Sequence, residues 1–143
     1  MIDLKILTFT IACLGLLIAY QQFQINSQKL KLDLFEKRYA VFDALKTIIN
    51  QVTHHATINN DHINEYKINI ADAKFLFNDD VNDYLQTVLN KSAALLLYQT
   101  KKELDNEHLV ILWFGEELDK YQNSFMPYMS FHGWNLKKYF RRK

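Results

Sequence analysis

The chain has 143 residues, a formal net charge of +1, one cysteine, three glycines and one proline. This length suits one small domain beside a membrane segment and leaves no room for a second domain. A single cysteine excludes an internal disulfide and a cysteine-ligated zinc site, which agrees with a domain in the reducing cytosol. Neither glycine nor proline occurs between Leu16 and Phe114, so long helices can form without a breaker and the expected fold is all-α.

The chain is organised around residues 6–23, ILTFTIACLGLLIAYQQF, whose apolar core carries no charge. As a helix this stretch would measure roughly 27 Å, close to the hydrocarbon thickness of a bilayer. We therefore predict a transmembrane anchor over residues 1–23. A cleaved signal peptide, a lipoprotein signal ending at Cys13 and a buried core helix are the alternatives. The signal peptide is disfavoured because a basic start and a small-x-small cleavage site are both missing. The lipoprotein signal is disfavoured because apolar residues follow Cys13, and the core helix because the uncharged run is long.

The flanking charges predict the orientation of this anchor. Four basic residues follow it before position 39, whereas the amino-terminal side offers only Lys5 against Asp3. Positive charge is retained on the cytoplasmic side of membrane proteins. We expect a bacterial inner-membrane protein with its amino terminus outside and residues 24–143 in the cytoplasm.

Small residues recur along one face of the anchor at spacings of four, three and four, and two amide side chains continue the same spacing. Such a face lets helix backbones approach closely in lipid. We name it the oligomer face and expect the protein to form a homo-oligomer through it. Alternatively, the spacing of the small residues arises by chance, and the amides lie on a solvated helix surface. Its members are Thr8, Ala12, Gly15, Ala19, Gln22 and Asn26.

The remaining chain reads as four amphipathic helices. The first continues the anchor to about His55, unbroken from about residue 3, because apolar residues repeat at helical spacing from Leu34 to Val52. The second helix is expected at about 62–77, capped by Asp61, and the third at about 80–103. The fourth is expected after the polar residues 104–107, and Gly115 is expected to lie at a close helix contact. Short turns between helices imply antiparallel neighbours and hence a cytosolic four-helix up-down bundle over residues 24–133. An irregular aromatic strip, FMPYMSFHGW, follows the fourth helix.

Residues 134–143 form a basic aromatic tail that holds five bases and no acid. Its charge suits anionic lipid headgroups. A solvated terminus fits equally well, and nucleic-acid binding is the weaker interpretation because ten residues without a fold are a poor signal. The residues expected at the membrane surface are Lys137, Lys138, Arg141, Arg142 and Lys143.

No motif predicts catalysis, and no cofactor or metal is expected. His54, His55 and His62 lie near acids, but Glu-x-x-His and His-Glu-x-x-His are both missing from the sequence. Cys13 lies in the anchor, no phosphate-binding glycine loop is present, and Arg38 lacks the following histidine of HEPN ribonucleases. Histidines on the surface or in turns are the expected state, and a histidine-based metal enzyme is the least favoured hypothesis.

The stretch KLKLDLFEKRYAVFDAL directly after one membrane helix, with F-x-PYMSF near the end, resembles small single-pass bacterial membrane proteins of unknown function. In layout the chain is also similar to the membrane proteins that accompany some type VI CRISPR systems. That likeness implies a ring-shaped pore assembled from one amino-terminal helix per subunit.

These observations lead to two functional hypotheses. The first is a non-enzymatic inner-membrane protein that self-associates through its anchor, as a ring or pore-forming effector in bacterial antiviral defence. If Ala12, Gly15 and Ala19 faced the axis of such a ring, the pore would be apolar and weakly selective. The second is a monomeric adaptor whose cytosolic bundle binds a partner protein through the aromatic strip between Phe125 and Phe131.

Overall fold

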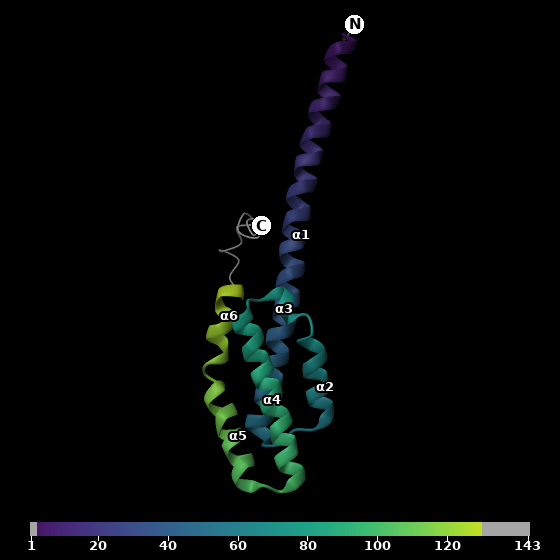
Figure 1. Cartoon of the computed structure of the whole chain (residues 1–143). Coiled ribbons are helices and arrows are strands. Elements are labelled where there is room, and N and C mark those ends of the chain that lie inside the picture. Colours follow the sequence, from purple (N-terminus) through teal and green to yellow (C-terminus); the bar gives the residue numbers. More distant parts are fainter. Residues whose placement is uncertain (1–2, 130–143) are drawn as a thin grey trace. The chain divides into compact units, whose positions relative to one another are not determined.

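The computed structural model describes residues 3–129 and consists of α-helices joined by short turns (Figure 1). The chain divides into two units, Met1–Phe35 and Glu36–Lys143, which are described separately. The predicted all-α class is confirmed. The described helices are α1 (Leu4–His55), α2 (Asn60–Asn69), α3 (Ala73–Leu76), α4 (Asp79–Lys101), α5 (Leu104–Glu117) and α6 (Tyr121–Met129).

Helix α1 is continuous over 52 residues, as the lack of a helix breaker predicts. In its amino-terminal unit the large apolar side chains are exposed: Phe9 is 71% exposed and Leu16 is 72% exposed. Within residues 3–129, α1 holds the one stretch that is long and apolar enough to cross a membrane, and its most apolar window is not buried. The buried-core interpretation of these residues therefore fails for the described chain.

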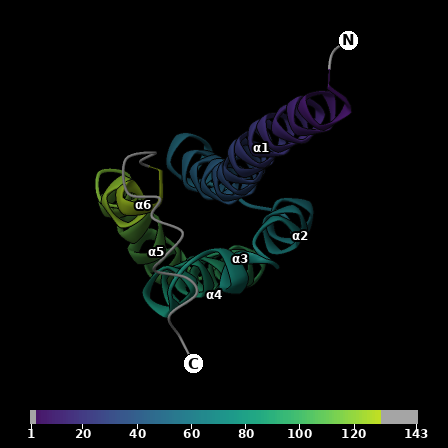
Figure 2. The ribbon, with the colours of Figure 1, turned by 90° about the horizontal axis from the view of Figure 1, so that it is seen from above.

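The second unit has a core of closely packed aliphatic and aromatic side chains. The part of α1 after Phe35 contributes a buried stripe at the spacing predicted from the sequence, including Val41, Leu45, Ile48 and Val52. In Figure 1, α2 and α5 run opposite to α4 and to the part of α1 in this unit, whereas α6 continues in the direction of α5. Helix α4 packs against α2, α3 and α5, and Figure 2 shows α2, α4 and α5 as neighbours in a curved row.

The expected helix over 62–77 is instead two helices, α2 and α3. The chain turns between them, where the amides of Ala71 and Ala73 bond to carbonyls only three residues earlier. This break allows Ile70 and Ala73, on either side of it, both to be buried. The predicted cap is also wrong, because the side chain of Asn59, not that of Asp61, accepts the His62 amide at 2.8 Å.

Two expectations about the carboxyl-terminal part are corrected. Residues 121–129 form helix α6 with Pro127 inside it, where the sequence predicted an irregular strip from residue 125. Burial of Tyr121 and Phe125 against the bundle accounts for the helix. Gly115 does not mark a close helix contact, since a Cβ built on it would meet no atom within 4 Å.

Candidate functional site

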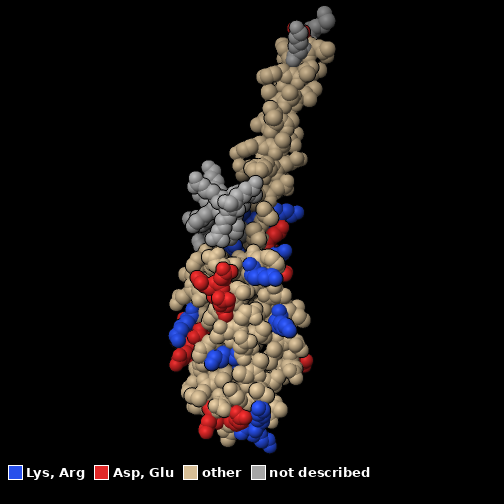
Figure 3. Space-filling view, in the orientation of Figure 1, with Lys and Arg blue, Asp and Glu red and all other residues tan. Residues whose placement is uncertain are grey.

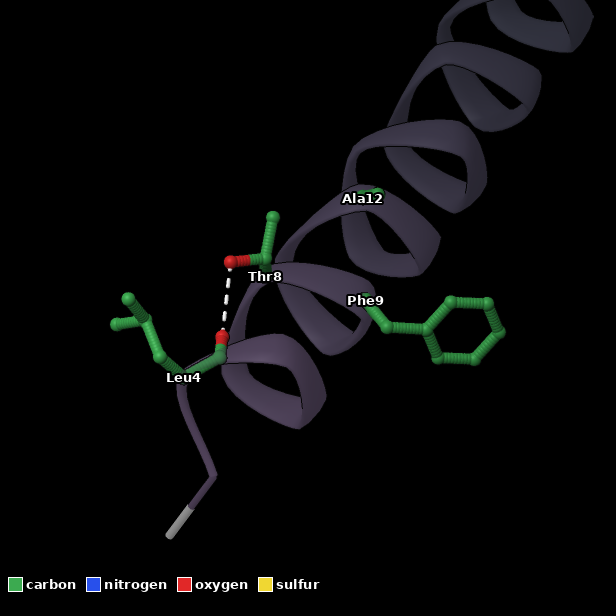
Figure 4. A pocket seen from close by; sticks show the side chains of 4 residues that line it. All are labelled: Leu4, Thr8, Phe9 and Ala12. Carbon is green, nitrogen blue, oxygen red and sulfur yellow. Dashed lines mark hydrogen bonds between the residues drawn. The ribbon is translucent and has the colours of Figure 1, made fainter.

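The predicted oligomer face lies along one exposed side of α1. All six of its residues are exposed. A shallow hollow of about 480 Å³ on this helix is lined by Leu4, Thr8, Phe9 and Ala12, so the structure brings two members of the face into one depression (Figure 4). Thr8 and Ala12 are the small residues that line this hollow, and Leu4 and Phe9 are the large ones.

The threonine hydroxyl on this face is satisfied within its own helix. Thr8 Oγ1 donates to the Leu4 carbonyl at 2.9 Å, as Figure 4 shows. The Thr8 hydroxyl therefore needs no polar partner from another helix, and Thr8 contributes to the face as a small residue. A Cβ on Gly15 would also meet no atom within 4 Å. Within residues 3–129 no atom would clash with a side chain here, so a requirement for glycine would have to come from a second helix.

The apolar segment is uncharged, and polar side chains follow it at its carboxyl end. No charged residue occurs between Ile6 and Gln28. Figure 3 shows this part of the helix without acidic or basic side chains, whereas both kinds are interspersed over the visible face of the second unit. Gln24 Nε2 donates to the Tyr20 hydroxyl at 2.9 Å. An amide paired with a tyrosine suits the boundary between hydrocarbon and headgroups.

The five basic residues expected at the membrane surface, Lys137 to Lys143, lie outside the described residues. So does the part of the aromatic strip after Met129. Of the strip that is described, Phe125 is fully buried and Tyr128 is half-buried, while Met126 is 67% exposed. Phe125 is therefore not available to bind a partner protein, as the predicted docking strip would require.

The second unit contains one buried charged residue within the described chain, Arg38, which is 5% exposed. Its Nε donates to the Leu76 carbonyl at 3.0 Å. The guanidinium lies 5.9 Å from the ring centre of Phe77 and 5.5 Å from that of Tyr128. This cluster was not among the sites predicted from the sequence. Arg38 precedes the buried Val41 by three positions, and that spacing was the signal for its burial.

Two tyrosines form polar contacts inside the same unit. The Tyr66 hydroxyl donates to the Leu85 carbonyl at 3.2 Å, and the Tyr84 hydroxyl donates to Glu117 Oε2 at 2.8 Å. Burial raises the pKa of the Tyr66 hydroxyl. Burial, followed by the hydrogen bond to Glu117, raises the pKa of the Tyr84 hydroxyl. Both groups therefore stay neutral and act as hydrogen-bond donors rather than as bases.

The histidines near the first turn do not converge on one point. His54 and His55 are exposed at the end of α1, and His62 is half-buried with its Nδ1 lacking a hydrogen-bond partner in the described structure. Within residues 3–129, no group of three or more His, Cys, Asp or Glu side chains could hold a metal ion.

No family of known proteins, no curated protein and no solved structure matches the chain. The class that the fold defines is an all-α protein in which a membrane-length apolar helix continues into the first helix of a small helical unit.

Proposed function

We propose that this protein is a non-enzymatic single-pass membrane protein that self-associates through the oligomer face of α1. The observation that supports it best is the contrast between the two parts of α1. After Phe35 its large aliphatic residues are buried, whereas from Leu4 to Ile25 the large apolar residues are exposed. Burial of one such side chain is worth about 2 kcal/mol, so leaving a dozen of them in water would be very unfavourable. A bilayer supplies the missing apolar surroundings.

The charges on α1 set the proposed orientation. The anchor crosses a bacterial inner membrane with the amino terminus outside, because the basic residues from Lys29 to Arg38 follow the apolar segment on its carboxyl side. The second unit then lies in the cytoplasm as an up-down helical bundle.

Membrane insertion is tested by fractionating cells that express the full chain. Wild-type protein should stay in the pellet after alkaline carbonate extraction, and protease added from outside should leave the second unit intact. Leu17→Asp places a charge in the middle of the span and should move the protein to the soluble or aggregated fraction. Wild-type protein that is released by carbonate would refute the anchor.

Self-association is tested by mass measurement and crosslinking in mild detergent. Gly15→Leu adds bulk on the oligomer face and should convert the oligomer into monomer. Thr10→Leu is the control, because it places the same leucine side chain on the other side of the helix and should leave the oligomer unchanged. A wild-type protein that is monomeric in detergent, or equal behaviour of the two variants, would argue against the face.

A ring of these helices would form a pore, and the resemblance in layout favours such a ring as an effector in bacterial antiviral defence. Ala12, Gly15 and Ala19 would line an apolar constriction that gates by dewetting. Bilayer recordings on purified oligomer should then show weakly selective conductance that Ala19→Asp increases. If both proteins are electrically silent, the anchor acts as an oligomerising tether without a pore.

The rival proposal is a monomeric membrane-anchored adaptor, and a feature of α5 favours it. Leu109 and Leu112 are 63% and 52% exposed on this helix. Beside them a shallow groove of about 420 Å³ is lined by Thr53, Ile111, Leu112, Gly115 and Glu116. Exposed apolar side chains beside a groove are typical of a protein-binding surface.

Affinity purification of the full chain distinguishes the two proposals. One stoichiometric partner without self-assembly, lost in Leu112→Asp, would support the adaptor. Leu97→Asp is the control, because Leu97 is 49% exposed on α4 and does not line the groove.

A further inference from the structure

Residues 67–76, which we name the α2–α3 corner, expose two large apolar side chains. Ile68 in the last turn of α2 is 74% exposed, and Phe75 in α3 is 76% exposed. The buried contacts of this corner are made by Ile70 and Ala73. Ile68 lies two residues before the first of these and Phe75 two residues after the second, and two helical residues correspond to a rotation of about 200°. The burial of one pair therefore turns the other pair outward.

A lysine precedes each of the two exposed apolar residues. Lys67 and Lys74 are themselves exposed, and Lys74 Nζ lies 4.9 Å from the centre of the Phe75 ring. A lysine can lay its aliphatic stem along an apolar surface while its ammonium group stays in polar surroundings. Apolar side chains with such lysines beside them suit the boundary between lipid headgroups and hydrocarbon.

The charges of this region nearly cancel. Residues 67–80 contain two lysines and three aspartates, two of which lie in the first turn of α4. Attraction to a charged surface is therefore weak here, and the apolar side chains are what the corner offers to a partner.

The α2–α3 corner lies at the end of the second unit where α1 enters it (Figure 1). Arg38, the first buried residue of α1 in this unit, donates through Nε to the carbonyl of Leu76, the last residue of α3. Helix α1 is unbroken, and Arg38 follows Gln28, the last residue of the uncharged stretch, by ten residues. Ten helical residues measure about 15 Å.

That distance lies within reach of the bilayer surface. The headgroup layer extends about 5–8 Å beyond the hydrocarbon on each side of a bilayer, which leaves about 10 Å between it and the level of Arg38. The length of a phenylalanine side chain and the usual tilt of a membrane helix, about 20°, cover this remainder. An exposed side chain on the α2–α3 corner can therefore meet the headgroups.

The opposite end of the second unit offers a matched site for comparison. Leu104, at the start of α5, is 73% exposed and follows Lys101 and Lys102. It lies at the far end because Gln99, five residues earlier, bonds to the Ala56 carbonyl just after α1 ends. Leu104 thus shares the exposure and the neighbouring lysines of the α2–α3 corner but not its position.

We propose that the α2–α3 corner rests on the cytoplasmic surface of the bilayer that holds α1, with Ile68 and Phe75 inserted among the lipid headgroups. This inference rests on the proposed membrane anchor. The contact gives the second unit a second point of attachment beside α1. Because apolar side chains make the contact, a zwitterionic lipid surface is sufficient for it.

Spin labelling of the full chain in phosphatidylcholine vesicles tests this contact. Single cysteines are introduced by Ile68→Cys, Phe75→Cys or Leu104→Cys into protein in which Cys13 is replaced by serine. Oxygen concentrates in lipid, whereas a nickel reagent stays in water. The ratio of their collision rates with the label should be several-fold higher at positions 68 and 75 than at position 104.

A label on Cys13 of the otherwise unchanged chain separates this proposal from the anchor itself. If Cys13 shows a high oxygen ratio while positions 68, 75 and 104 are alike, the α2–α3 corner stays in water and the contact is refuted, although the anchor stands. If Cys13 also shows the ratio found in water, both the anchor and the contact fail.

A second set of variants tests which side chains make the contact. With the label at position 68, Phe75→Asp should lower the oxygen ratio to the value at position 104, whereas Leu104→Asp should leave it unchanged. Both residues are exposed, so neither change disturbs the core. Vesicles with equal parts of phosphatidylglycerol should give the same ratios as phosphatidylcholine alone. A high ratio that survives Phe75→Asp, or that appears only with phosphatidylglycerol, would overturn the assignment to the apolar pair.

Discussion

The side chain of Gln99 on α4 is bonded to the backbone of Ile58 in the turn between α1 and α2. The Ile58 amide donates to Gln99 Oε1 at 3.3 Å, and Gln99 Nε2 donates to the Ala56 carbonyl at 2.8 Å and to Glu107 Oε1 at 3.2 Å. One amide group therefore supplies the backbone partners of a turn and links it to the start of α5. This turn places α2 against α4.

Replacing Gln99 should loosen that turn. Gln99→Ala removes both backbone partners and should lower the free energy of unfolding by about 1–2 kcal/mol. Gln86→Ala, on the exposed side of α4, is the control and should have little effect. Denaturation of the full chain in mild detergent, followed by circular dichroism, provides the measurement, and equal effects of the two variants would contradict the assigned role.

Gln99→Glu separates hydrogen bonding from shape. A carboxylate cannot donate to the Ala56 carbonyl, and it would face the carboxylate of Glu107. The variant should therefore be less stable than wild type at pH 7 and recover part of the difference near pH 4, where a carboxyl group begins to protonate. A pH-independent difference between variant and wild type would count against this explanation.

The buried tyrosines predict a loss of stability in alkali. Burial raises the pKa of Tyr66 in the folded protein above its ordinary value of about 10, so above pH 10 the unfolded chain releases a proton that the folded chain retains. Stability is therefore fully present below pH 10 and falls as the pH rises further. Tyr66→Phe should cost about 1 kcal/mol at pH 7 through the lost bond to Leu85, and less at pH 11. Stability curves of the two proteins that stay parallel from pH 7 to pH 11 would disprove this prediction.

Two helices end in residues with a left-handed backbone that are not glycine. Ala56 follows α1 with φ 52°, and Lys102 follows α4 with φ 59°. Because side chains other than glycine are strained there, Ala56→Gly and Lys102→Gly should each stabilise the fold by about 0.5–1 kcal/mol. Lys101→Gly, one residue earlier and inside α4, should instead destabilise by about 1 kcal/mol. Thermal denaturation of the three variants gives the comparison, and a loss of stability in all three would refute the cap geometry.

Ser92 is fully buried on α4, and its hydroxyl donates to the Val88 carbonyl of its own helix at 2.9 Å. Ser92→Ala should change stability by less than about 1 kcal/mol, because the lost bond is local and alanine favours helix. Ser92→Leu should destabilise by about 1–3 kcal/mol through overpacking. Denaturation curves that place Ser92→Ala below Ser92→Leu would show that the hydroxyl, rather than the space, matters here.

Much of the local structure follows from the sequence. The missing helix breakers and the apolar run predict one continuous helix from the anchor to His55, and the structure has it. Periodicity also predicts which positions of α1 are buried, and Val41, Leu45 and Val52 all lie in the core. Helical spacing decides the face on which a residue lies, because 3.6 residues complete a turn whatever the neighbours are. The oligomer face is a pattern of the same kind, and its partner helix stays a prediction.

Only the tertiary structure decides how those faces are used. Arg38 and Ser92 occupy the buried stripes of α1 and α4 although they are polar, and no local rule names Leu76, Phe77 or Tyr128 as the partners of Arg38. The break between α2 and α3, and the helix through Pro127, likewise go against local expectation. In each case the free energy comes from burying apolar side chains against residues distant in sequence, and that gain exceeds what the local backbone prefers.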